Sequence, residues 1–262
     1  MNSLAIFFEL TFRKIFLCSF DFSNMTDLLF QKDSYLKEFE AKVKAVEEDC
    51  VILDKTAFAY RGGGLQSDDG ELTTSEGEKY SVIEAFSKSG KILHKLDPQP
   101  DQSLINQVVR CSINWEKRYK QMRMHTALHA ISGLLYKKYG STVTGGNITP
   151  EKSRVDFEID HLRQDRVQEI IDEMIKIIDG DYKISVSFMA RDEALKDPEL
   201  IRTKVNLIPN SVKTIRIVDI ENVDRQADGG VHVASTKEIG TIIPLKSENR
   251  GKNNKRLYFT IE

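Results

Sequence analysis

Apolar and polar residues alternate through much of the stretch 36–110, as they do in β-strands with one buried face. The alternation is clearest in the sequence FEAKV at 39–43, and CVIL at 50–53 forms a short apolar run. Turn residues separate these runs at 62–64, 68–70, 77 and 90, and the proline-containing segment 97–101 is either a long turn or a domain boundary. Many short strands at this spacing predict a small β-barrel.

The pattern changes to helical spacing further along the chain. A long helix is predicted to begin after Asn114, an N-cap residue, and to end at Gly140, a C′ glycine. A second amphipathic helix is predicted over 167–178, closed by Gly180. Alternating strands are predicted at 155–159, 184–188, 215–218, 240–245 and 257–261. Because helices and antiparallel strands are interleaved without a βαβ rhythm, the predicted fold class is α+β.

The length of 262 residues favours two domains. We predict a β-barrel domain over 25–110 and a two-layer α+β domain over 111–262, with an antiparallel sheet and the long helix as its centre. Residues 1–24 are apolar and aromatic, broken by the basic pair Arg13-Lys14, and no signal-peptide cleavage pattern follows them. We interpret them as an N-terminal extension, either a disordered or loosely docked arm or sequence translated upstream of a start at Met25.

Composition restricts the choice of compartment and partner. The net charge of −2 indicates no overall basic character, so any RNA site must be a local patch. The three cysteines are widely spaced and form no CxxC motif, which favours a reducing, cytoplasmic compartment over a disulfide framework. No run reaches the roughly 18 to 20 apolar residues of a membrane span, so we expect no membrane partner.

Two distant segments carry candidate metal ligands. His125 and His129 are four residues apart, which places them on one face of the long helix. A Gly-Gly turn lets the backbone bring both Asp228 and His232 inward. Three imidazoles and a carboxylate suit one Zn²⁺ ion. Asp228 either ligates the ion, holds a water or orients a histidine, and these alternatives stay open.

The order of motifs is more specific than the histidine pair alone. WEKRYKQMRMHTALH (115–129), VTGGNI (143–148), RVDF (154–157) and ADGGVHVASTKEIG (227–240) together resemble the free-standing alanyl-tRNA editing proteins of the AlaX type. These are relatives of the editing domain of alanyl-tRNA synthetase. The resemblance covers residues 25–262. It implies an N-terminal β-barrel, followed by an editing domain whose zinc-site residues are His125, His129, Asp228 and His232.

Two departures from the family pattern touch the expected site. The glycine-rich sequence RGGGLQSDDG at 61–70 matches a family loop beside the editing pocket, so Gly63, Gly64 and Asp68 are expected near the substrate. Many members have Gln and Pro where this chain has Leu65 and Gln66. The family often has Cys-Gly-Gly-Thr-His where this chain reads DGGVH at 228–232. Aspartate is a harder ligand than a thiolate, so the metal preference can differ.

The resemblance implies hydrolysis of serine, and also glycine, wrongly esterified to alanine tRNA. A pocket for alanine cannot reject either residue strongly, whereas a second site that hydrogen-bonds the seryl hydroxyl can select serine. Thr144 is the expected partner of that hydroxyl. RNA-backbone contacts are expected from Lys117, Arg118, Lys120 and Arg123, with a further basic cluster at Arg250, Lys252, Lys255 and Arg256.

The chain is too short to hold a synthetase catalytic domain as well, so we expect it to act in trans on released aminoacyl-tRNA. The metal either activates water or anchors the substrate amino group. Two other functions stay open at this point. One is a tRNA- or metal-binding module of the same fold with weakened catalysis, and the other is a hydrolase for threonyl esters. The sequence leaves the oligomeric state undetermined.

Overall fold

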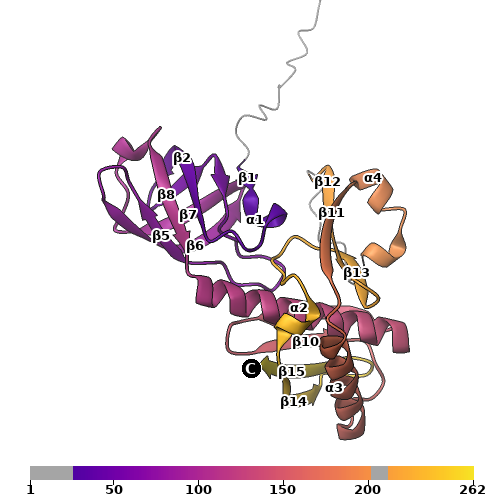
Figure 1. Cartoon of the computed structure of the whole chain (residues 1–262). Helices are drawn as coiled ribbons and strands as arrows, with labels where there is room; N and C mark the ends of the chain where they lie inside the picture. The colour runs from indigo at the N-terminus through magenta and orange to yellow at the C-terminus, as the bar shows by residue number, and fades with distance from the viewer. Residues whose placement is uncertain (1–25, 202–211) are drawn as a thin grey trace, which may run out of the picture.

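A computed structural model describes residues 26–201 and 212–262, so the prediction for residues 1–24 lies outside the described residues. The predicted α+β class with an N-terminal barrel is confirmed. In Figure 1 the barrel lies at one end, and a long helix runs from beneath it across the middle of the molecule. In the part of the chain that the structure describes, no helix is both long enough and apolar enough to span a bilayer.

The barrel closes through six strands. Their order around the barrel is β2 (Glu38–Glu47), β3 (Cys50–Leu53), β7 (Lys91–Asp97), β6 (Lys79–Lys88), β5 (Gly70–Thr73) and β8 (Val108–Ile113). Alternate residues of β2, including Phe39, Ala41 and Val43, face its interior, as the sequence pattern predicted. The segment 97–101 is a turn within the barrel. Strand β8 continues to Ile113, past the predicted boundary at residue 110.

Short elements attach the N-terminal end to the barrel. Strand β1 (Asp27–Leu28) pairs in parallel with β4 (Lys55–Thr56). The single-turn helix α1 (Leu29–Lys32) follows β1 and buries Phe30. A 3-10 turn, η2 (Gln102–Leu104), connects β7 to β8. The segment after α1 lies close to the start of the long helix. There the carbonyl oxygen of Ser34 accepts a hydrogen bond from the Arg118 guanidinium.

The long helix α2 (Trp115–Tyr139) has the predicted caps. The side chain of Asn114 accepts a hydrogen bond from the backbone N–H of Lys117, and Gly140 adopts the left-handed conformation at φ 61°. Burial of α2 is not confined to one stripe, because elements pack on several of its faces. Helix α3 (Gln164–Asp179) is amphipathic and covers α2 with Val167, Ile170 and Met174.

Two antiparallel sheets complete the second half of the chain. One has the order β14 (Ile242–Asn249), β15 (Lys255–Ile261), β10 (Ser153–Phe157) and β9 (Val143–Ile148). The other has the order β11 (Ile184–Ala190), β12 (Thr214–Ile220) and β13 (Asp224–Ala227). Short helical turns α4 (Arg191–Ala194), η3 (Pro198–Leu200) and η4 (Thr236–Ile239) lie between the strands. One core joins α2, α3 and both sheets.

The glycine-rich loop joins the barrel to this second core. The backbone N–H of Ile148 donates to Gly64 O at 2.8 Å, and Leu65 forms a β-bridge with Ile148. Gly64 has a φ of 89°, and a methyl group there would lie 2.8 Å from the carbonyl oxygen of Gly146. Only glycine tolerates both conditions. Leu65 is buried in the core that contains α2. The loop is therefore packed against the second half of the chain.

His94 is a structural histidine of the barrel. Its Nε2 lies 2.8 Å from Thr56 Oγ1, and its Nδ1 lies 3.3 Å from the carbonyl oxygen of Val51. Burial lowers the pKa of His94 to about 4. The unfolded chain, with a pKa of about 6.5 at this residue, therefore takes up the proton first as the pH falls.

This shift predicts a loss of stability in mild acid. Between pH 7 and pH 5 the shifted pKa of His94 should lower the free energy of unfolding of the protein by about 2 kcal/mol. Urea unfolding at both pH values, for the wild type and for His94→Gln, measures the effect. Between pH 7 and pH 5 the free energy of unfolding of His94→Gln should fall by about 2 kcal/mol less than that of the wild type. An identical pH dependence of the two proteins would contradict the assignment.

Candidate metal centre

The inner face of α2 meets the loop that follows β13 at four side chains. His125 and His129 come from successive turns of α2, and Asp228 and His232 come from the loop. Their nearest ligand atoms all lie within 4.8 Å of one another. The three imidazoles are between 3% and 7% exposed. The structure thus brings together all four residues that the sequence offered as ligands.

The spacing of these atoms suits a small ion. Asp228 Oδ1 lies 3.6 Å from His125 Nε2 and 3.8 Å from His129 Nε2. Asp228 Oδ2 lies 3.1 Å from His232 Nε2. Four ligands at the usual zinc distances of tetrahedral sites lie about 3.4 Å apart from one another. The distances from the Asp228 carboxylate to the three imidazoles are therefore close to those of a tetrahedral site.

The second ring nitrogen of each histidine is held by a different partner. Nδ1 of His125 lies 3.2 Å from the carbonyl oxygen of Val231. Nδ1 of His129 lies 3.3 Å from Asp224 Oδ2, and Nδ1 of His232 lies 3.1 Å from Thr126 Oγ1. When each Nδ1 carries the proton and donates to its partner, each Nε2 presents a lone pair to the centre.

Sequence reasoning missed the two side chains among these partners. Thr126 lies between His125 and His129 in the sequence, but no spacing rule connects it to His232. Asp224 is buried and also accepts a 2.8 Å hydrogen bond from Gln226 Nε2. It follows a predicted strand by a few residues and resembles a turn aspartate in the sequence. Both residues fix the orientation of an imidazole ring.

The electrostatics of the cluster favour a divalent cation. Burial lowers the pKa of His125 to about 4, and burial together with the neighbouring His125 lowers the pKa of His232. Burial also acts to lower the pKa of His129, but hydrogen bonds to Asp224 and Asp228 raise it to about 9. Burial acts to raise the pKa of Asp228, and the surrounding imidazoles hold it well below its usual range. A largely buried carboxylate among three buried imidazoles is the charge pattern of a metal site.

The Gly-Gly turn sets the position of Asp228. The backbone N–H of Gly230 donates to Asp228 Oδ2 at 2.7 Å. Arg216 Nη1 donates to the carbonyl oxygen of Asp228 at 3.0 Å. A methyl group at Gly230 would lie 2.6 Å from Cε1 of His125 and 2.5 Å from Cδ1 of Leu65. Glycine at this position is therefore what lets the loop approach the ring of a candidate ligand.

Comparison with known proteins identifies the family. The chain is 44% identical to the alanyl-tRNA editing protein AlaX-M of Saccharolobus solfataricus over 239 residues, which is 91% of this chain and all of that protein. It is 35% identical to AlaX-M of Methanosarcina acetivorans over 90% of this chain and 99% of that protein. The chain belongs to the AlaX-M family of alanyl-tRNA editing proteins.

Longer synthetases contain the same region. The alanine–tRNA ligase of Methanococcus maripaludis is 34% identical over 90% of this chain, which corresponds to 26% of the ligase. Residues 215–258 match the family model of the threonyl and alanyl tRNA synthetase second additional domain. Residues 23–117 match the model of class II (A) tRNA synthetases. The first match contains residues 228–232, the loop that carries Asp228 and His232 and is called the metal loop below. The second match contains the barrel and its glycine-rich loop.

A substitution in the metal loop tests the site of this AlaX-M protein without removing a ligand. Gly230→Ala should displace the ring of His125 and lower zinc affinity at least about 10-fold, within the range seen when ligand orientation is lost. Gly229→Ala is the matched control, because its methyl group would meet only the end of the Gln31 side chain at 3.3 Å. Competition with a zinc-binding dye measures both affinities. Equal affinities for the two variants would contradict the close-approach argument.

The expected substrate residues have different environments. Gly63 and Gly64 lie in the loop that packs on β9. Thr144 lies in β9, and its hydroxyl donates to Asn254 Oδ1 at 3.3 Å. Asp68 is 2% exposed and accepts hydrogen bonds from the guanidinium of Arg118 and from the backbone N–H of Ala59. Its carboxylate is thus fully engaged by the protein.

The burial of Arg118 contradicts its expected role as an RNA contact. The side chain is fully buried, and its guanidinium binds Asp68 and the carbonyl oxygens of Ser34 and Ala57. Arg118 lies where α2 passes under the barrel, so it faces the barrel and not the solvent. The residue fastens the two halves of the chain together.

The other expected RNA contacts are nearer the surface. Lys117 pairs with Asp69 at 2.6 Å, and Lys120 pairs with Glu116 at 3.0 Å. Both lysines line a hollow of about 330 Å³ that includes Gln66 of the glycine-rich loop. Arg123 donates to the carbonyl oxygens of Ile239 and Glu262. In the C-terminal basic cluster Lys255 is buried and Arg256 pairs with Asp156, while Arg250 Nη1 lies 4.0 Å from Glu248.

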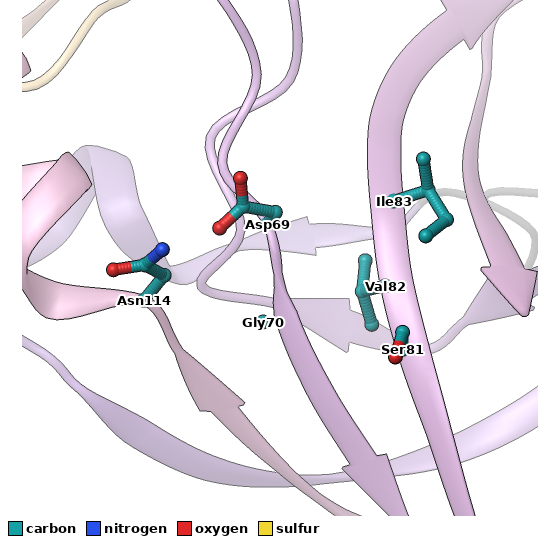
Figure 2. Close-up of a pocket in the computed structure, with 6 residues that line it drawn as sticks. All are labelled: Asp69, Gly70, Ser81, Val82, Ile83 and Asn114. Carbon is teal, nitrogen blue, oxygen red and sulfur yellow. The ribbon is translucent and has the colours of Figure 1, made fainter. Parts of the chain in front are cut away.

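A second hollow lies on the barrel. Figure 2 shows its lining, with Asp69, Asn114 and the β6 residues Ser81, Val82 and Ile83 around an open space. Its volume is about 380 Å³. None of the four metal-cluster residues contributes to it, and a nearly half-exposed isoleucine forms part of its edge. This hollow is therefore separate from the candidate metal centre.

Proposed function

We propose that this AlaX-M protein removes serine, and more slowly glycine, from mischarged alanine tRNA by hydrolysing the aminoacyl ester. It acts in trans, on aminoacyl-tRNA released into the cytoplasm. The convergence of His125, His129, Asp228 and His232 within 4.8 Å is the observation that carries the proposal. Full-length similarity to editing proteins supports a tRNA ester as the substrate.

Zinc is the proposed cofactor, one ion for each chain. The residues fit it, since three imidazole nitrogens and one carboxylate are the ligand types zinc prefers. The three Nδ1 partners leave each Nε2 directed at the centre, and Asp228 is ionised. His129, whose pKa is raised to about 9, would release its Nε2 proton when the metal binds. The ion would supply Lewis-acid chemistry for ester hydrolysis. Asp228, a hard ligand, would make the site more tolerant of metals harder than zinc.

Residues of the chain would bind the rest of the substrate. We assign recognition of the seryl hydroxyl to Thr144, whose hydroxyl is polar, part-buried and held by Asn254. Strand β9 lies directly on α2, where a methyl group at Gly146 would touch Leu128. A site that hydrogen-bonds a hydroxyl discriminates against alanine, because alanine cannot form that hydrogen bond. Gly63 and Gly64 would let the loop backbone approach the substrate closely.

Lys117 and Lys120 are the proposed contacts to the RNA backbone. They line the same hollow, and neither is buried. Lys120 lies five residues before His125 on α2, about 8 Å along the helix axis. Their ion pairs with Asp69 and Glu116 would be exchanged for phosphate contacts, so binding should weaken as salt increases.

A deacylation assay tests the proposal. Purified protein is incubated with seryl-, glycyl-, threonyl- and alanyl-tRNA, and the loss of the amino acid is followed over time. We expect fast release of serine, slower release of glycine and retention of alanine. Turnover of none of the four would overturn the enzymatic function. Faster release of threonine than of serine would reassign the substrate.

A further inference from the structure

Tyr60 lies where the barrel core meets the core around α2. It packs against both hydrophobic clusters and is half-buried. Its ring meets Phe30 edge-on, with the ring centroids 5.9 Å apart. The glycine-rich loop begins directly after it, and a methyl group at Gly62 would lie 3.7 Å from the Tyr60 ring. The ring is therefore fixed from two sides by packing.

The elements around Tyr60 also contact the metal loop. Gln31, next to Phe30, donates from Nε2 to the carbonyl oxygen of Gly229 at 3.3 Å. Leu65 of the glycine-rich loop lies against Gly230. Burial raises the pKa of the Tyr60 phenol, and the negative charge of Asp228 raises it further. The phenol therefore lies in the electrostatic field of a candidate metal ligand.

The Tyr60 hydroxyl has no hydrogen-bond partner among the described residues. Other tyrosines of this region differ, since the hydroxyls of Tyr35 and Tyr119 both donate to Glu238 and that of Tyr139 donates to Glu169. Because Tyr60 is only half-buried and its hydroxyl is not among the buried polar atoms that lack a partner, this hydroxyl is accessible to a bound ligand. The Tyr60 phenol keeps its proton at neutral pH, so it is available as a donor.

We propose that the Tyr60 hydroxyl donates a hydrogen bond to the carbonyl oxygen of the aminoacyl ester bound at the metal centre. This inference rests on the proposed function and adds a catalytic residue to it. In the hydrolysis, the oxygen of a water molecule bonds to the carbonyl carbon, and the carbonyl oxygen gains negative charge. The ester C–O bond then breaks, and the ribose oxygen takes the proton that the water has lost. Tyr60 retains its own proton and stabilises the charged oxygen.

The ester carbonyl is preferred over the seryl side chain for a positional reason. Tyr60 lies five residues before Leu65, which packs on the metal loop where the reacting ester would lie. Thr144, our candidate for the seryl hydroxyl, comes from β9. A donor to the carbonyl acts on every aminoacyl ester alike, whereas a donor to the side chain acts on serine alone. The two roles therefore predict different substrate dependence.

The test compares Tyr60→Phe with the wild type on seryl-tRNA and glycyl-tRNA. We expect kcat to fall about 100-fold on both esters, as it does when one oxyanion donor is removed. KM and zinc content should change less than about twofold, since the hydroxyl binds neither RNA nor metal in this proposal. Tyr80→Phe is the matched control, because Tyr80 belongs to the barrel core only and its hydroxyl faces Glu78. Its kcat should equal that of the wild type.

An unchanged kcat for Tyr60→Phe would overturn the proposal. A loss confined to seryl-tRNA would also overturn it, because the hydroxyl would then contact the seryl side chain. Wild-type activity on the two esters reports separately on the proposed function. An inactive wild type would overturn both inferences, whereas an active wild type with an equally active Tyr60→Phe would overturn only the role of Tyr60. Thermal unfolding of the variants checks that each is folded.

Discussion

Alanine in place of His129 is expected to lower the rate of seryl-tRNA deacylation at least about 100-fold and to abolish tight zinc binding. The imidazole of His129 is held by Asp224 on one side and faces Asp228 on the other. Its removal leaves at most three of the four ligands and leaves Asp224 buried without that partner. His125→Ala should have the same effect, because His125 contributes the neighbouring Nε2.

The matched control for this loss is His161→Ala. His161 is exposed and precedes α3, away from the four clustered side chains. Zinc content and initial deacylation rates are measured for all three variants. The control should retain both the metal and the wild-type rate. Full activity of His129→Ala with no metal bound would show that deacylation does not depend on the metal cluster.

Removing the guanidinium of Arg118 is expected to cost about 3 to 5 kcal/mol of stability, the range for breaking a buried ion pair. The reason is the Asp68 carboxylate, which is 2% exposed and would be left without its cation. Urea unfolding of Arg118→Ala measures the loss. Arg110→Ala is the control, because Arg110 and Glu38 form a pair whose side chains are 68% and 56% exposed. Such a surface pair contributes about 1 kcal/mol or less.

A double variant separates the ion pair from simple loss of packing. Arg118→Met combined with Asp68→Asn removes both charges, and the oxygen of the introduced amide can still accept a hydrogen bond from the backbone N–H of Ala59. The double variant should be more stable than the sum of the two single losses predicts. Strict additivity would contradict the buried-pair interpretation. The interpretation would also be contradicted if Arg118→Ala were as stable as the wild type but bound tRNA more weakly. That outcome is the one expected of an RNA contact.

Local patterns predicted most of the fold. The caps Asn114 and Gly140 define α2 because each satisfies backbone groups that the helix leaves unpaired. Alternation predicted the barrel strands because one face of each strand is buried. The end of the last barrel strand was less predictable. Strand β8 continues past residue 110 and pairs with both β2 and β5, and no residue of the sequence marks where pairing with distant strands stops.

The four candidate ligands could be picked out because the spacing within each pair is local. His125 and His129 are one helical turn apart, and Asp228 and His232 flank one glycine turn. The residues that hold the rings are determined by tertiary contacts instead. Thr126 reaches His232 over 106 positions, and Asp224 reaches His129 over 95. Arg118 looked like a solvated basic residue because its partner, Asp68, is 50 positions away.

One measurement tests the central claim most directly: the seryl-tRNA deacylation rate of the purified protein before chelation, after chelation and after the return of zinc. The four-ligand cluster predicts that removal of the metal abolishes the reaction. One equivalent of zinc per chain should restore it in the wild type but not in His129→Ala. Undiminished hydrolysis of seryl-tRNA by metal-free protein would contradict the account.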